Sequence, residues 1–128
     1  MNTKLVMLVS ALMMGVFGSG LIFVPNEIAH YAGLVGVGDA LILLQILGAL
    51  YFAFAMINWM SKGILIGGIY SRPIAVGNFT HFFVAGLALI KAAIASPSAL
   101  MVGFAAVYGT FAGLFGLILF THPGKKDE

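Results

Sequence analysis

The sequence predicts an all-α integral membrane protein, an up-down-up-down bundle of four transmembrane helices. Of its 128 residues, 62% are hydrophobic and only 8% are charged, whereas a soluble domain carries about 25% charged residues. The apolar residues fall into four runs, and each run has about the 20 residues that a helix needs to cross the hydrocarbon core of a bilayer. We therefore treat residues 1–128 as a single transmembrane domain.

Helix-breaking and capping residues set the bounds of the four runs. Pro25 stops the first run, Asp39 is placed to cap the second, and residues 96–98 separate the last two. The expected spans are residues 5–24, 40–60, 74–95 and 99–120.

Two loops carry more apolar residues than a free loop needs. Part of the loop 25–38, including Ile28 and Tyr31 on one helical face, is expected to rest in the membrane interface. The loop 61–72 contains an apolar stretch from Ile64 to Tyr70 that is too short to span. It is either a re-entrant or interfacial segment or an extension of the second helix.

Most basic residues fall on one side of a four-span topology. The positive-inside rule then places both termini in the cytoplasm of a multi-pass protein of the bacterial inner membrane. Lys91, about one turn inside the third span, either snorkels to the headgroups or pairs with Glu27 or Asp39. With a net charge of only +2, nucleic acid is not an expected partner. The basic residues that share one side are Lys4, Lys62, Arg72, Lys125 and Lys126.

Small residues recur at helical spacing on the first and fourth spans. Such faces let helix backbones approach closely, so we expect them to pack against other helices of this bundle or of another protein. The expected packing residues are Gly109, Gly113 and Gly116, with Ala106, and Gly15 and Gly18, with Ala11.

Polar side chains inside the membrane are costly and therefore informative. Asn78 and His81 share a face of the third span, and an antiparallel second span would bring Asn58 to their depth. Trp59 and Tyr70 border the same interface. This cluster is either a pocket for a lipid headgroup or small amphiphile, or a set of interhelical hydrogen bonds. A third interpretation, a single His81 ligand to haem or chlorophyll, would need a large apolar cavity.

The sequence contains few side chains that are arranged for catalysis. It contains no cysteine, which excludes disulfides and thiol chemistry. It shows no nucleophile–base pair, no intramembrane carboxylate pair and no phosphate loop. We therefore expect no catalytic residue, metal site or cofactor.

Three nearby segments contain the concentration of distinctive residues that is typical of a family signature. They are Asn58 to Lys62, Arg72-Pro73 and Asn78 to His81. In size, span layout and short loops, the whole chain resembles small four-helix bacterial membrane proteins of the DoxX-like group. The resemblance implies the fold and a bacterial membrane location, and it assigns no role to any residue.

Three functions follow as expectations, and the third in order is a membrane enzyme, which would have to work with Asn58, Asn78, His81 and Tyr70. The first is a non-catalytic small membrane protein, either an accessory subunit of a larger complex or a self-associating bundle. The alternative is a binder or carrier of a lipid-like small molecule, which uses the polar residues near the cytoplasmic leaflet. Expected partners are membrane lipids, other membrane subunits, or a second copy of the chain.

Overall fold

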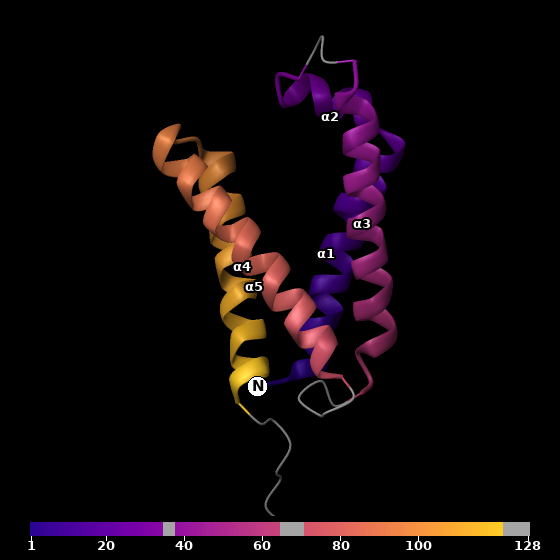
Figure 1. Ribbon diagram of the computed structural model, residues 1–128, viewed down its shortest axis with the longest axis vertical. Coiled ribbons are helices and arrows are strands. Elements are labelled where there is room, and N and C mark those ends of the chain that lie inside the picture. Colours follow the sequence, from indigo (N-terminus) through magenta and orange to yellow (C-terminus); the bar gives the residue numbers. More distant parts are fainter. Residues whose placement is uncertain (35–37, 65–70, 122–128) are drawn as a thin grey trace, which may run out of the picture. The chain divides into compact units, whose positions relative to one another are not determined.

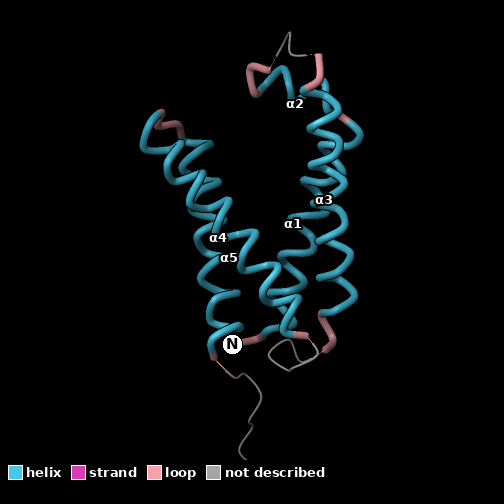
Figure 2. The backbone as a smooth tube through the Cα atoms, in the orientation of Figure 1, coloured by secondary structure: helices cyan, strands magenta, loops and turns pink. Residues whose placement is uncertain are grey.

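The computed structural model describes residues 1–34, 38–64 and 71–121, and in these residues every regular element is a helix (Figures 1 and 2). Four of the helices are long and apolar enough to cross a membrane. The predicted all-α class with four membrane-length helices is therefore confirmed. The helices are α1 (Thr3–Phe23), α2 (Pro25–Tyr31), α3 (Ala40–Ser61), α4 (Arg72–Ala95) and α5 (Ala99–Phe120).

The long helices begin and end within two residues of the predicted bounds. The reason is that helix-breaking and capping residues act on the backbone next to them. Pro73 occupies the first turn of α4, where a missing N–H costs nothing. At the start of α5, the Ser98 hydroxyl accepts a hydrogen bond from the Met101 backbone N–H at 3.1 Å. That bond satisfies one of the orphan donors of the first turn.

The prediction that Asp39 is the N-cap residue of the second span is confirmed, although its side chain does not act as a cap. That side chain makes no capping hydrogen bond. Its backbone is already close to helical, with φ −85° and ψ −7°. A capping side chain instead starts from an extended backbone, as at Ser98, from which its oxygen reaches the N–H groups of the first turn.

The loop after α1 forms a short helix, α2, that begins at Pro25 (Figure 1). Ala29 is buried on one side of α2, while Tyr31 is 91% exposed. Gly33 follows with φ +70°, a backbone conformation that glycine adopts without strain. The predictions for residues 65–70 and for Lys125 and Lys126 lie outside the described residues.

The helices form two compact units, residues 4–62 and residues 1–3 with 63–128. In the first unit, α1 and α3 run antiparallel. Ser10 near the start of α1 contacts Asn58 near the end of α3, and Phe17 further along α1 packs edge-on against Tyr51 at 6.2 Å between ring centroids. The bonded pair and the ring pair therefore set the register of this hairpin.

The closest approach of α1 to α3 is built from two glycines. A Cβ atom added to Gly18 would lie 2.7 Å from the Phe52 backbone nitrogen and 2.9 Å from the Gly48 carbonyl oxygen. A Cβ added to Gly48 would lie 2.9 Å from the Gly18 oxygen. Neither position leaves room for a side chain, so the two backbones meet here in the way that small residues allow in membranes.

The second unit consists of α4 and α5, which are antiparallel and joined by aromatic packing. The Phe82 ring of α4 stacks on Phe111 of α5 at 4.8 Å and on Phe115 at 5.7 Å between centroids. Tyr108 meets the same ring at 5.3 Å in a T-shaped arrangement. Offset and edge-on contacts of this kind add about 0.5–1.5 kcal/mol per pair beyond area burial.

Candidate functional site

Asn58 joins α3 to α1 through its amide. Its Nδ2 donates a hydrogen bond to the Ser10 hydroxyl oxygen at 3.1 Å and lies 3.9 Å from the Met14 sulfur. The Ser10 hydroxyl in turn donates to the Met7 carbonyl oxygen at 2.9 Å. Both polar side chains are fully buried. Asn58 thus makes an interhelical hydrogen bond within the α1–α3 unit, with a serine that sequence reasoning did not select.

Asn78 and His81 lie on α4, in the second unit. The Asn78 amide nitrogen donates to the Ile74 carbonyl oxygen at 3.0 Å, one turn back along its own helix. The His81 ring lies 5.1 Å from the Phe82 ring and 5.7 Å from the Tyr108 ring, between centroids. Tyr108, buried at the same level of α5, therefore belongs with His81. Sequence reasoning counted it among the polar residues of the membrane but did not link the two.

The predicted contact of Asn58 with Asn78 or His81 spans the two units and stays a prediction. Tyr70, the fifth residue of that cluster, lies outside the described residues. Trp59 is 45% exposed near the end of α3, and the Nζ atom of Lys62 lies 3.2 Å from the centroid of its ring. Such a geometry is a cation–π contact.

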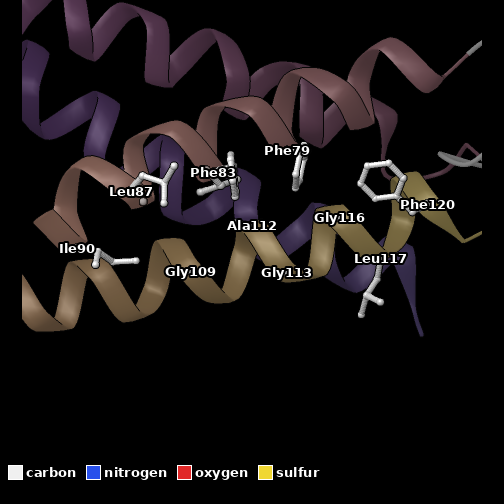
Figure 3. A pocket seen from close by; sticks show the side chains of 12 residues that line it. Phe79, Phe83, Leu87, Ile90, Gly109, Ala112, Gly113, Gly116, Leu117 and Phe120 are labelled. Atoms are coloured by element: carbon white, nitrogen blue, oxygen red, sulfur yellow. The ribbon is translucent and has the colours of Figure 1, made fainter.

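The α4–α5 unit carries an apolar groove of about 510 Å³ (Figure 3). Along one edge, Phe79, Phe83, Leu87 and Ile90 follow one another on α4. The floor is formed by small residues of α5. They are Gly109, Ala112, Gly113 and Gly116.

The glycines of this groove differ in what surrounds them. A Cβ added to Gly116 would lie 3.2 Å from the Phe79 ring, so this glycine lets the ring approach α5. A Cβ added to Gly109 or Gly113 would meet no described atom within 4 Å. The Cα positions of these two glycines therefore face open space and leave a strip of backbone along α5 that no described side chain covers, while the Gly109 backbone nitrogen itself lies near Gly86 of α4.

On α1, the expected packing glycines both face α3. A Cβ on Gly15 would lie 3.6 Å from the Ala55 Cβ, an ordinary contact, whereas Gly18 sits at the tight crossing with Gly48. Gly48 was missed in the sequence, although a signal existed. Gly18 and Gly48 lie at similar distances from the ends of two consecutive antiparallel spans, which is where a close crossing is expected.

Among the residues that the structure describes, no group of three or more histidine, cysteine, aspartate or glutamate side chains could hold a metal ion. The described polar side chains that hydrogen-bond between or along the helices are amides and hydroxyls, and the His81 imidazole lies against the Tyr108 ring. The described arrangement is suited to helix association and to binding of apolar molecules. Comparison with models of protein families, with curated proteins and with solved structures finds no match to this chain.

Proposed function

We propose that the chain is a small, non-catalytic membrane protein that works by association of its transmembrane helices, and that α5 pairs with α5 of a second copy. The observation that carries this proposal is the groove of the α4–α5 unit, with its open backbone strip at Gly109 and Gly113. Lipid tails are as apolar as leucine, so apolar surface alone does not drive helices together in a membrane. A strip of exposed backbone does, because it permits close van der Waals contact.

The spacing of the two glycines favours a second copy over a different partner. Gly109 and Gly113 form a G-x-x-x-G motif within the apolar α5, a pattern typical of transmembrane helix dimers. Two copies inserted in the same orientation have parallel α5 helices, and a two-fold axis along the membrane normal brings the same strip of each copy together. The phenylalanines at the edge of the groove would then flank the crossing.

The proposal includes the identity of the membrane and the orientation of the chain in it. Lys4, Lys62 and Arg72 fall on one side of the four spans, and this bias supports termini in the cytoplasm of a bacterial inner membrane. The layout also supports kinship with the DoxX-like group. A lipid-like ligand held by Asn58, Asn78 and His81 has less support, because Asn58 already bonds to Ser10.

The test replaces Gly113 by isoleucine and measures the mass of the intact assembly in detergent. A Cβ added at Gly113 meets no described atom within 4 Å, so we expect the Gly113→Ile chain to keep its fold. We expect the parent to be a dimer and Gly113→Ile to raise its dissociation constant by about tenfold or more, or roughly 1.4 kcal/mol.

Gly103 supplies a matched control for this test. It lies on the same helix, is equally open, and does not line the groove. Gly103→Ile should therefore dimerise as the parent does. A monomeric parent, or a Gly113→Ile chain that melts earlier at unchanged mass, would contradict the proposal, since the strip would then pack within one chain or face lipid.

A further inference from the structure

A second apolar groove, of about 430 Å³, runs along the α1–α3 unit, and its lining shares no residue with the groove of the α4–α5 unit. Gly15 and Ala55 contribute small residues to its lining, and Leu12, Met56 and Trp59 contribute large ones. The groove extends along α3 from Trp59 to Phe52. That distance is seven residues, or about 10 Å of helix at 1.5 Å per residue.

One end of this groove carries a positive charge. Trp59 lies two residues before the end of α3, and the Lys62 ammonium lies 3.2 Å from the centre of its ring. The ring holds the flexible lysine at the groove end, while the charge keeps that end at the water–lipid boundary. Tryptophan also prefers this boundary, where headgroups lie.

The dimensions match one leaflet of a bilayer. Half of the hydrocarbon core is about 15 Å thick, so a groove that starts at the boundary and runs inward for about 10 Å covers most of the acyl region of a leaflet. The depth, the apolar lining and the cation at the outer end together fit an amphiphile with a negative headgroup.

The same charge argues against a second copy in this groove. A two-fold axis along the membrane normal would bring the Lys62 side chains of both copies to the same depth and close to one another. Like charges at that distance repel, whereas a phosphate would complement the ammonium.

We propose that the α1–α3 groove binds one anionic phospholipid of the leaflet at the C-terminal end of α3. An acyl chain lies along the groove past Gly15, and the phosphate contacts the Lys62 ammonium. This site is independent of the α5 dimer, because the two proposals use different helices.

The experiment measures lipids retained on the purified full-length chain by native mass spectrometry. The chain is offered phosphatidylglycerol and phosphatidylcholine with identical acyl chains in equal amounts. A basic side chain near a headgroup surface contributes about 1 kcal/mol, so we expect the parent to prefer phosphatidylglycerol about fivefold. Lys62→Gln should abolish the preference and Lys62→Arg should keep it.

Two further variants separate the charge from the groove. Leu12→Ala removes an exposed apolar side chain from the groove lining and should lower retention of both lipids. Lys91→Gln removes another lysine near a helix end, on α4, and should leave the preference unchanged. Excess inorganic phosphate should not displace the lipid, since it cannot fill the groove. An equal preference in the parent and Lys62→Gln, or an equal loss in Lys91→Gln, would overturn the proposal.

Discussion

At the scale of single residues, the most informative contact is the one between Asn58 and Ser10. A polar side chain in hydrocarbon needs a hydrogen-bond partner, and this need made Asn58 stand out in the sequence. Its partner could not be predicted, because serine occurs on many helix faces and its hydroxyl is often satisfied by its own helix. The Ser10 hydroxyl accepts a hydrogen bond from the Asn58 amide of α3 and donates one to the Met7 carbonyl oxygen of its own helix.

This contact predicts a measurable coupling between the two side chains. We expect the effects of Ser10→Ala and Asn58→Leu on unfolding free energy to be non-additive by about 0.6 kcal/mol, with an upper bound of about 1.7 kcal/mol. Ser19→Ala combined with Asn58→Leu serves as the control. Ser19 lies nine residues beyond Ser10 on α1, about 13.5 Å away along the axis, so that pair should be additive. Additive effects for Ser10 and Asn58 as well would show that the hydrogen bond contributes nothing.

At the scale of helices, the sequence predicts the length and the ends of each helix. It does not predict the rotation of a helix about its own axis. Proline and serine act locally, so Pro25, Pro73 and Ser98 mark helix ends wherever the rest of the chain lies. The face that a helix buries is set by its neighbours. Helices that are hydrophobic all round carry no stripe that indicates this face. For this reason the sequence did not indicate that Gly48 and the ring cluster around Phe82 lie at helix contacts.

The tight crossing of α1 and α3 predicts a contrast between two glycines of one helix. Gly18→Ala would push a Cβ into the backbone of α3, so we expect a loss of about 1–3 kcal/mol in unfolding free energy. Gly15→Ala makes only an ordinary contact at 3.6 Å and should be neutral or slightly stabilising, since alanine is the better helix former. Thermal unfolding in one detergent, followed by circular dichroism, compares the two. Equal melting temperatures would count against the crossing.

At the scale of the whole molecule, composition predicts the class of protein, and the distribution of basic residues predicts an orientation that stays a prediction. Both signals are sums over many residues, so predictions from them do not depend on how the helices pack. The polar cluster of Asn58, Asn78 and His81 is different, because it depends on the rotation and pairing of individual helices. Two of its members share α4, as their spacing requires, and the third lies in the other unit.

Orientation can be tested cleanly because the chain has no native cysteine. Single cysteines replace Lys4, at the start of α1, and His30, in α2. We expect an impermeant thiol reagent to label His30→Cys in intact cells and to label Lys4→Cys only after permeabilisation. The reverse pattern would invert the topology, and labelling of both in intact cells would indicate dual insertion.

The most direct test of self-association at α5 is oxidative cross-linking of a single cysteine in native membranes. A disulfide forms only where two Cα atoms come within about 7 Å, which two helices achieve where small residues let their backbones meet. The account predicts that Gly113→Cys gives a cross-linked dimer rapidly and in high yield, while Gly103→Cys on the same helix stays monomeric. Equal cross-linking at both positions, or none at Gly113→Cys, would contradict the account.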